Sequence, residues 1–409
     1  MALTGERHGP ALVAPATLAT SAAAVVGELA LRAGARWRLG ALDGAALLGE
    51  RAAIFGYRRN GRISPGATCR LTRARDGWIA INLPRADDWA ALAAWLESEG
   101  WAGVGGTVLA DEGAWARLAA DVSVREKATL LERARWLGLA VADAEPAARS
   151  TPAPWSIFAT GERAGERNHR EPLVLDLASL WAGPLAGHLL LGAGARVVKL
   201  ESARRPDGAR LGPRGFFDLL NGGKECVALD LREHEDRTLL ARLIARADVI
   251  LESTRPRALE QLGIDAVAWV RGRPGRVWVS ITGYGREAPG RDWVAFGDDA
   301  AAAAGLALAT GVRAGLDGPI GCGDAIADPL AGTHAALAAF AAWQEGGGVG
   351  IDVSLAGVTR HLLERAPMPP WTGGALEVAE PRARVASVAA RALGEDTSRV
   401  LAELEIRAC

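Results

Sequence analysis

Hydrophobic and polar positions alternate regularly along the second part of the chain. Short apolar runs of the kind that form buried strands lie at 173–177, 196–201, 226–231, 248–252 and 276–281. The stretches between them have helical spacing. One places Pro184 in its first turn, and another carries an apolar stripe at every third or fourth position. Strands and helices in alternation predict an α/β, Rossmann-like large domain built on a parallel sheet.

The first part of the chain has a different pattern. Residues 69–83 predict a β-hairpin with a polar turn, and helical spacing follows at 87–99 and 124–137. A stretch rich in proline, alanine and charged residues then precedes the regular pattern. We therefore predict a small α+β domain at 1–144, a linker with little regular structure at 145–172, and the large domain at 173–409.

Composition narrows the class of protein only a little. The 409 residues, 49% of them hydrophobic, suffice for two domains with sizeable cores. Lysine plus arginine total 47 against 48 acidic residues, which argues against nucleic-acid and membrane-surface partners. Residues 11–27 lack charges but are mostly small, so we expect neither a signal peptide nor a membrane span. We predict a soluble, cytoplasmic, globular protein.

The cysteines also favour a reducing compartment. They are far apart and form no Cys-x-x-Cys pair, so neither a disulfide framework nor a zinc cluster is predicted. The four are Cys69, Cys226, Cys322 and Cys409.

Two glycine motifs resemble nucleotide-binding motifs, but the residues and predicted elements around them do not fit such sites. Gly192 and Gly194 follow a predicted helix and precede a strand, whereas a dinucleotide fingerprint needs the reverse order. They predict a helix C-terminus instead. Gly223-Lys224 suggests a P-loop, but Glu225 stands where serine or threonine is required. The sequence therefore predicts no NAD, flavin or nucleotide triphosphate site.

Two other segments remain open to more than one interpretation. The turn at 178–184 joins a strand to a helix with small residues and a proline. It either leaves backbone N–H groups free for an anion or serves only for tight packing. Asp328 stands directly before Pro329 and an apolar helix. By itself it favours a capping aspartate, which would stabilise the helix by about 1 kcal/mol.

Several short segments of the large domain form an ordered set. They are Val174-Leu-Asp-Leu177 with Ala182-Gly-Pro184, Gly194-Ala-Arg-Val-Val-Lys-Leu-Glu201, Asn221-Gly-Gly-Lys224 with 227–231, 247–252 with Arg255-Pro256 and Leu262-Gly263, 280–285, Ala327-Asp328-Pro-Leu-Ala-Gly332, and Gly350-Ile-Asp-Val-Ser354. No one segment is decisive, but the ordered set is specific. Together the segments resemble the family III CoA-transferases, which include formyl-CoA transferase, carnitine CoA-transferase and 2-methylacyl-CoA racemase.

The resemblance implies a chemistry and a site. Asp328 falls where the family carries its nucleophile, which passes CoA from an acyl-CoA to a carboxylic acid through an anhydride and an aspartyl-CoA thioester. CoA would then be a substrate, with no metal and no redox cofactor. Arg232 and Arg255 would pair with its phosphates, unless they are ordinary solvated charges. The implied CoA contacts are Trp181, Ala182, Leu229, Asp230, Leu231, Arg232, Ser253, Thr254, Arg255, Thr282, Gly283, Tyr284 and Gly285.

Departures from the family pattern affect the alternatives. Racemases of the family carry Gly-His-Asp where this chain has Gly297-Asp298-Asp299, so a two-base proton exchange loses its histidine. This favours a transferase over a racemase, while Asp298 in place of the histidine, together with the unusual domain order, motivates a third alternative, a non-catalytic CoA-binding relative. Trp181 replaces a residue that is often small and polar, which argues against the small diacids of formyl-CoA transferase.

The order of the parts is also unusual. Family members begin with the 174–177 strand and carry their small domain after the 350–354 strand, whereas here the small domain comes first. Residues 1–5 resemble 307–311, which suggests a degenerate copy of the catalytic segment at the start of the chain. Family members form interlocked homodimers, so we expect a homodimer, possibly interlocked, with acyl-CoA and a carboxylic acid as its small-molecule partners.

Overall fold

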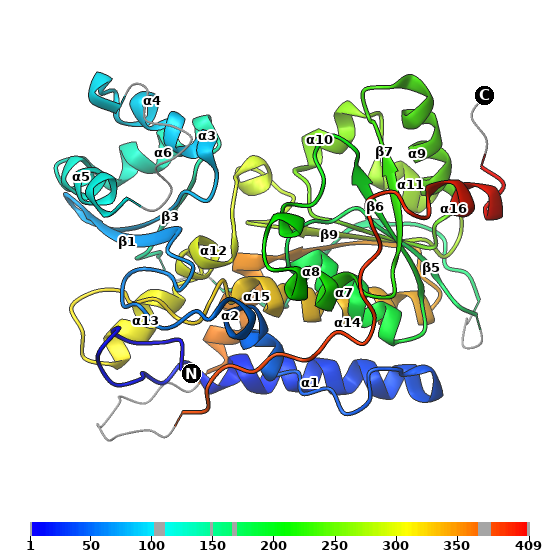
Figure 1. Ribbon diagram of the computed structural model, residues 1–409, viewed down its shortest axis with the longest axis horizontal. Helices are drawn as coiled ribbons and strands as arrows, with labels where there is room; N and C mark the ends of the chain where they lie inside the picture. Colours follow the sequence, from blue (N-terminus) through cyan, green and yellow to red (C-terminus); the bar gives the residue numbers. More distant parts are fainter. Residues whose placement is uncertain (1, 102–110, 148–149, 166–169, 367–377, 407–409) are drawn as a thin grey trace.

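The predicted large domain is confirmed in a computed structural model, which describes residues 2–101, 111–147, 150–165, 170–366 and 378–406. Its sheet has the order β4-β10-β9-β8-β5-β6-β7, and all neighbours are parallel except β4 and β10 (Figure 1). The strands are β4 (Ser156–Thr160), β5 (Leu173–Asp176), β6 (Arg196–Ser202), β7 (Glu225–Leu229), β8 (Val249–Glu252), β9 (Val277–Thr282) and β10 (Val349–Ser354).

Helices cover both faces of this sheet, as the crossover connections require. They are α7 (Ala182–Gly192), α8 (Arg214–Asn221), α9 (His234–Arg246), α10 (Pro256–Gln261), α11 (Ala266–Arg271), α12 (Gly297–Ala303), α13 (Leu306–Arg313), α14 (Ala327–Gln344) and α15 (Leu355–Glu364). Adjacent strand residues enter opposite cores. Val174 packs with α7 and α14, whereas Leu175 packs with α9 and α11. This period of two follows from the pleat of the strand.

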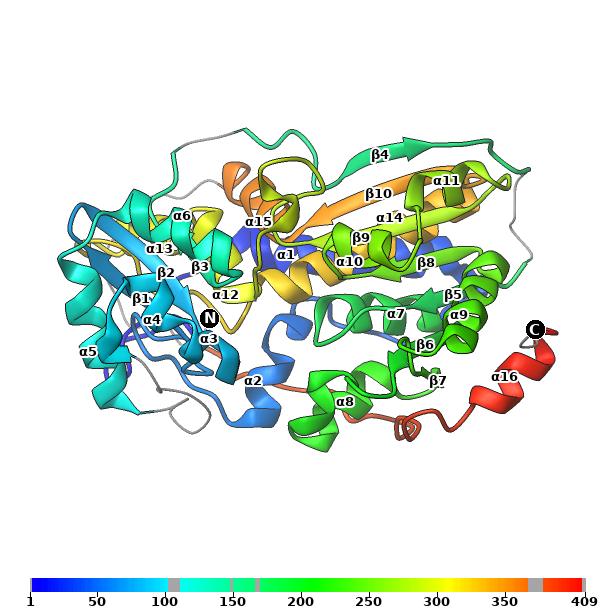
Figure 2. The ribbon, with the colours of Figure 1, turned by 90° about the horizontal axis from the view of Figure 1, so that it is seen from above.

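The predicted linker contains a strand. We expected little regular structure at 145–172, but β4 lies within it and pairs antiparallel with β10, forming the outer edge of the sheet in Figure 2. The sequence pattern gave no sign of it because the strand is short and mostly exposed. An antiparallel edge strand on an otherwise parallel sheet is common in such folds.

The small unit contains the predicted hairpin. It has a three-stranded antiparallel sheet in the order β1-β2-β3, with its own core of tryptophans and leucines. The region expected to form one helix at 87–99 is instead two short helices. The elements are β1 (Cys69–Ala74), β2 (Gly77–Asn82), β3 (Ala140–Asp143), α3 (Ala86–Ala90), α4 (Leu92–Leu96), α5 (Glu112–Ser123) and α6 (Lys127–Leu137).

The first helix does not belong to the small unit, contrary to the predicted 1–144 boundary. Helix α1 (Ala16–Ala33) buries a stripe at Leu18, Ala22, Val26 and Leu29 in the core that contains α7 and α14. Hydrophobic spacing identifies the helix but not the partner of its apolar face, so sequence could not assign α1 to a domain. The core of the large unit therefore includes the N-terminal helix.

Two further expectations concern the N-terminal region. Residues 307–311 lie within α13, whereas residues 2–5 form a turn and bends, so these parts of the proposed copy differ in structure; an 18-residue helix follows each of them, α1 and α14. The helix Ala16–Arg36 is long and apolar enough, by length and composition, to cross a membrane. A minor part of it is buried, on the face that packs along α14.

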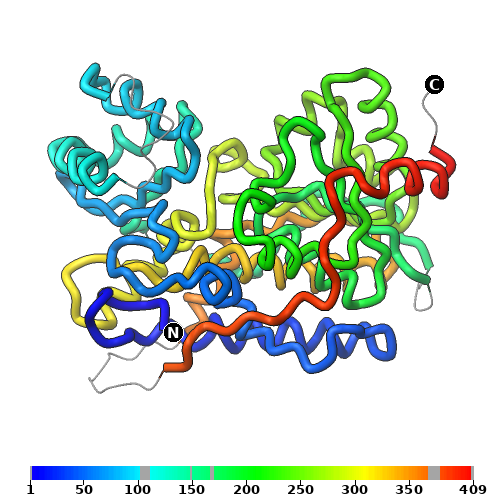
Figure 3. The backbone as a smooth tube through the Cα atoms, in the orientation of Figure 1, coloured from blue at the N-terminus to red at the C-terminus, as the bar shows by residue number. Residues whose placement is uncertain are grey.

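The C-terminal segment runs the length of the molecule as an extended chain, from near α2 (Glu50–Phe55) to α16 (Thr397–Glu403) (Figure 3). Arg384 forms a bidentate pair with the buried Glu50. Asp396 then exchanges backbone and side-chain hydrogen bonds with Cys226 at the edge of the sheet. The segment thereby covers the edge strand β7, which would otherwise offer unpaired backbone groups.

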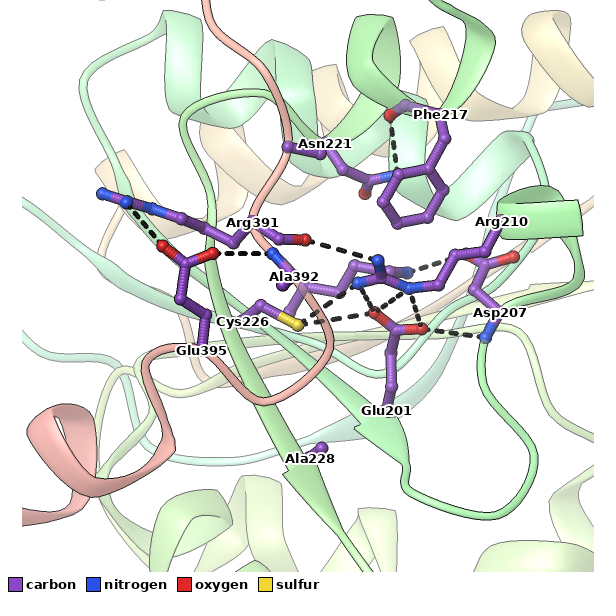
Figure 4. A network of polar contacts seen from close by, with 12 residues as sticks. Glu201, Asp207, Arg210, Phe217, Asn221, Cys226, Ala228, Arg391, Ala392 and Glu395 are labelled. Atoms are coloured by element: carbon purple, nitrogen blue, oxygen red, sulfur yellow. Dashed lines mark hydrogen bonds and ion pairs between the residues drawn. The ribbon is translucent and has the colours of Figure 1, made fainter. Parts of the chain in front are cut away.

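A polar network fixes the segment where it meets the sheet (Figure 4). Arg210 pairs with Glu201, and its guanidinium also reaches Cys226 Sγ and the Arg391 carbonyl. Cys69, Cys226 and Cys322 are buried free thiols, and Cys409 lies outside the described residues.

Candidate active site

The chain order of the strands locates a ligand site. Beginning at β5, the chain first adds β6 and β7 on one side and later β8, β9 and β10 on the other. Open α/β sheets bind ligands at such a switch point, beyond the carboxyl ends of the strands. Here the turn after β5 meets the turn after β8, where the Ser179 N–H donates to Ser253 Oγ at 3.3 Å. Two of the predicted CoA-binding segments, at 181–182 and 253–255, thus begin at one edge.

A buried ion pair holds the turn after β5 from one side. Lys224 Nζ donates to Asp176 Oδ2 and to the Pro184 carbonyl, each at 2.8 Å, while Asp176 Oδ1 accepts from the Ala178 N–H. Both charged side chains are almost fully buried. Burial lowers the pKa of Lys224 to about 8, against the attraction of Asp176. Lys224, which the sequence suggested as part of a failed P-loop, therefore has a structural role.

A second pair holds the same turn from the other side. Lys199 Nζ donates to the Ala178 carbonyl and to Asp207 Oδ2, each at 2.9 Å, and Asp207 Oδ1 accepts from the Leu180 N–H. Against the opposing effect of burial, Lys199 lowers the pKa of Asp207. Leu180 has a φ of 71°, an unfavourable conformation for leucine. The two ion pairs thus keep a strained turn in one shape.

Asp328 is not the helix cap that its position before Pro329 suggested. It is the second residue of α14, Ile326 is the N-cap residue, and no side chain caps the helix. Among the described residues, no group donates a hydrogen bond to the Asp328 carboxylate. A Cβ added to Gly297 would lie 2.3 Å from its Oδ2. The half-buried carboxylate therefore lies against a bare glycine and remains free to react.

Three further aspartates, Asp298, Asp299 and Asp324, lie close to Asp328. Burial raises the pKa of Asp328 to about 7, and the negative charges of Asp298, Asp299 and Asp324 add to the rise, while Arg51 opposes it. Burial likewise raises the pKa of Asp298 to about 6 and that of Asp299 to about 7. Carboxyl groups with pKa values near neutrality are typical of functional sites.

The two aspartates of α12, Asp298 and Asp299, both accept hydrogen bonds from neighbouring segments. Asp299 Oδ1 accepts from Asn82 Nδ2 of the small unit at 2.9 Å, and Tyr284 Oη donates to Asp299 Oδ2 at 3.4 Å. Asp298 accepts from the Ala325 N–H at 2.8 Å. The segment that replaces Gly-His-Asp therefore joins the small unit to the loop that precedes Asp328.

Sequence reasoning missed the cation of this site. Arg51 lies on α2 and forms two hydrogen bonds with Asp324, at 2.8 and 2.5 Å, across a separation of 273 residues. Its guanidinium carbon lies 5.0 Å from the centre of the Trp181 ring. No spacing along the chain connects Arg51 to Asp324, although Asp324 itself stands four residues before Asp328 and could have been grouped with it.

The structure sorts the thirteen predicted CoA contacts by accessibility. Arg232, Ser253 and Arg255 are exposed, and the others are half-buried or buried. Leu229 packs in the core, and Thr282 donates to Asp352. The Trp181 indole is also buried, edge-on to Phe216. The indole also packs against the Arg51 guanidinium, whose carbon lies 5.0 Å from the centre of its ring. Ala182, Asp230, Leu231, Thr254, Gly283, Tyr284 and Gly285 lie at or beside the carboxyl ends of their strands.

A cleft of about 630 Å³ separates the small unit from the large sheet. Tyr284 and Gly285 lie on one wall and Arg135 of α6 lies on the other, with the Trp293 ring 3.8 Å from its guanidinium carbon. Asp328 does not line this cleft, and Tyr284 stands between the cleft and Asp299. Within the described ranges, no three His, Cys, Asp or Glu side chains converge as a metal site.

Fold and site together define an α/β protein with a candidate ligand site at the carboxyl edge of its sheet. At the start of a crossover helix it carries an aspartate whose carboxylate has no hydrogen-bond partner among the described residues. Residues 171–390, just over half of the chain, match the model of CoA-transferase family III, so the chain belongs to that family.

Relatives with assigned activities match about half of the chain. An acetyl-CoA:oxalate CoA-transferase from Acetobacter aceti is 30% identical, over 48% of this chain and 53% of its own. A succinyl-CoA–D-citramalate CoA-transferase from Chloroflexus aurantiacus is 32% identical, over 47% and 50%. A CaiB/BaiF family protein from Brucella suis matches 47% of this chain and 54% of its own, with 27% identity and a TM-score of 0.42. This chain thus spans about half the length of the curated relatives that it matches.

Proposed function

We propose that this protein transfers CoA from an acyl-CoA to a carboxylic acid, with Asp328 as the nucleophile. The observation that carries the proposal is the state of that carboxylate. It lies in the family-matched segment, in the first turn of an 18-residue helix, where the helix dipole favours an anion. It has no hydrogen-bond partner among the described residues and lies against Gly297. The activities of the related CoA-transferases support the reaction class.

The proposed exchange proceeds in balanced acyl transfers. The Asp328 carboxylate attacks the thioester carbonyl of the donor, which forms a mixed anhydride and releases CoA thiolate. The thiolate attacks the aspartyl carbonyl, which gives an aspartyl-CoA thioester and frees the donor's carboxylate. The acceptor carboxylate then repeats these steps in reverse and leaves as the new acyl-CoA. A covalent intermediate replaces one difficult exchange with easier steps.

We place CoA along the carboxyl edge of the sheet. The strained turn at 178–181 and the turn at 253–255 supply fixed backbone there, and Arg232 and Arg255 supply exposed positive charge for its phosphates. Arg232 is only 3.9 Å from Asp230, which itself pairs with Arg204. We also propose that the protein acts in the cytoplasm and forms a homodimer. Sedimentation of the purified chain tests the homodimer.

The test is isotope exchange followed by mass spectrometry. Labelled acetyl-CoA or succinyl-CoA is mixed with oxalate, D-citramalate and glutarate, chosen from the relatives' acids, and new acyl-CoAs are identified. Asp328→Ala should lower the rate at least 10³-fold, as loss of a nucleophile does. Hydroxylamine should convert the aspartyl-CoA thioester to a hydroxamate on Asp328 with release of CoA.

The matched control is Asp265→Asn, which alters an aspartate that caps another helix, α11. We expect it to keep transfer near the wild-type rate. Transfer at the normal rate by Asp328→Ala would reject the nucleophile. CoA binding without exchange, by the wild type and over all the acids, would favour a non-catalytic relative.

A racemase is the second candidate, because the pKa of Asp298 rises to about 6 in the place of the missing histidine. Two carboxyl groups near neutrality, Asp298 and Asp328, are a possible acid–base pair. Solvent deuterium appearing at Cα of 2-methylacyl-CoA, lost in Asp298→Asn, would support it. The absence of such exchange alongside CoA transfer would leave the transferase.

A further inference from the structure

The carboxylate cluster around Asp328 presents a problem for the proposed reaction. The acceptor is itself an anion, and it has to approach a site where Asp298, Asp299 and Asp324 surround the nucleophile. Like charges repel strongly in a partly buried site, where the effective dielectric is low. An anionic acceptor therefore needs a cation at this point.

Arg51 is placed to be that cation. Its Nε and Nη2 atoms hold Asp324, whose carboxylate is fully buried, while the arginine side chain keeps 24% exposure. The remaining Nη1 group has no hydrogen-bond partner among the described residues and is not among their buried unsatisfied atoms. One edge of the guanidinium is thus fixed, and the other is accessible to a ligand.

The position of Arg51 is set on several sides. Its guanidinium carbon lies 5.0 Å from the centre of the buried Trp181 ring and 5.9 Å from that of Tyr57. The preceding residue, Glu50, is held by Arg384 of the C-terminal segment. An arginine held in this way loses little side-chain freedom on binding a carboxylate, for which its planar fork is suited.

We propose that Arg51 is the residue that binds the carboxylate of the acceptor acid, through Nη1, as that acid approaches the aspartyl-CoA thioester on Asp328. The inference rests on the proposed transferase activity and extends it to the part of the chain outside residues 171–390. It means that the N-terminal segment completes the site of the family-matched domain.

The test separates the two half-reactions. Because Arg51→Gln alone leaves Asp324 as a buried unpaired charge, the variant to use is Arg51→Gln/Asp324→Asn, which removes both charges. Formation of the aspartyl-CoA thioester is measured with acetyl-CoA at pH 9, above the pKa of about 7 to which burial raises Asp328. We expect the KM for acetyl-CoA, whose acyl group enters without charge, to stay within threefold of wild type, while the KM for glutarate or oxalate rises at least tenfold.

A neutral acceptor provides the internal control. Hydroxylamine is uncharged at pH 9 and should cleave the thioester equally fast in the wild type and the double variant. Arg58→Gln is the matched control variant, since Arg58 lies in the same segment with 76% of its side chain exposed. It should leave the KM values for glutarate and oxalate unchanged. Calorimetry with glutarate should show weaker binding to the double variant only.

The outcomes distinguish this inference from the proposed function. An unchanged acceptor KM with normal thioester formation would overturn the role of Arg51 and leave the transferase standing. Equal losses with hydroxylamine and with carboxylates would also overturn it, because they would point to a general disturbance of the site. No thioester in the wild type would overturn both proposals.

Discussion

Two sets of buried charge lie at the carboxyl edge of the same sheet, and they are built differently. Around the turn after β5, Lys224 pairs with Asp176 and Lys199 pairs with Asp207, so the two cations match the two anions. At the second set, Asp298, Asp324 and Asp328 share Arg51, and Asp299 adds a fourth negative charge. The first set has hydrogen bonds to the backbone it supports, whereas Asp328 has none among the described residues.

The difference shows how similar groups acquire different roles. A balanced, hydrogen-bonded pair of buried charges fixes the shape of a turn. An excess of carboxylates in a partly buried site instead raises pKa values toward neutrality, as for Asp328 at about 7. We therefore assign a structural role to the ion pairs around the turn after β5. The catalytic role we assign to the carboxylates around Asp328.

The largest expected effect comes from unbalancing the paired set. Lys224→Met leaves Asp176 as an uncompensated buried charge, and removal of one partner of such a pair costs about 3 to 5 kcal/mol of the free energy of unfolding. Urea denaturation measures the loss. Lys224→Met/Asp176→Asn, which removes both charges, should recover a large part of it. A loss below about 1 kcal/mol in the single variant would contradict the supporting role.

The unbalanced set should respond in the opposite direction. Folding raises the pKa of Asp328 from 3.8 to about 7, so the folded state binds its proton more tightly than the unfolded chain does. The resulting stability is fully present below pH 3.8 and is lost as the pH rises through 7. Asp328→Asn, of the same size but uncharged, avoids that loss.

We expect Asp328→Asn to be roughly 1 to 3 kcal/mol more stable than the wild type at pH 8 and equal to it near pH 4, since one pKa unit corresponds to about 1.4 kcal/mol. Urea midpoints at a series of pH values give the comparison. Transfer activity should fall in the wild type below pH 7, because the protonated carboxyl cannot attack. A variant less stable than wild type at pH 8 would show that Asp328 is a paired, structural residue.

Sequence reasoning predicted the strands and the aspartate of the second set, but not its cation. Strands such as 173–177 and 226–231 are apolar enough to be found from pattern alone, and the family resemblance placed Asp328 at the position of the nucleophile. Arg51 could not be found in this way, because its pairing with Asp324 is a tertiary contact between distant segments. Strand β4 escaped because only one of its five residues is buried, which leaves no hydrophobic pattern.

The smallest effect should come from an exposed pair in the network of Figure 4. Arg391 and Glu395 lie 2.9 Å apart, but their side chains are 53% and 42% exposed, so water screens the pair and competes for it. The contact between this segment and Arg210 uses the Arg391 carbonyl, which Arg391→Ala retains. We therefore expect Arg391→Ala to leave the urea midpoint within the error of repeated measurements.

The matched variant is Arg210→Met, in the same network, which deprives the buried Glu201 of its guanidinium. Its midpoint should fall well outside that error, because burial leaves Glu201 no water to replace the lost partner. If both variants shifted the midpoint equally, burial would not be what separates supporting charges from solvated ones. The distinction between the two sets at the edge of the sheet would then lose its physical basis.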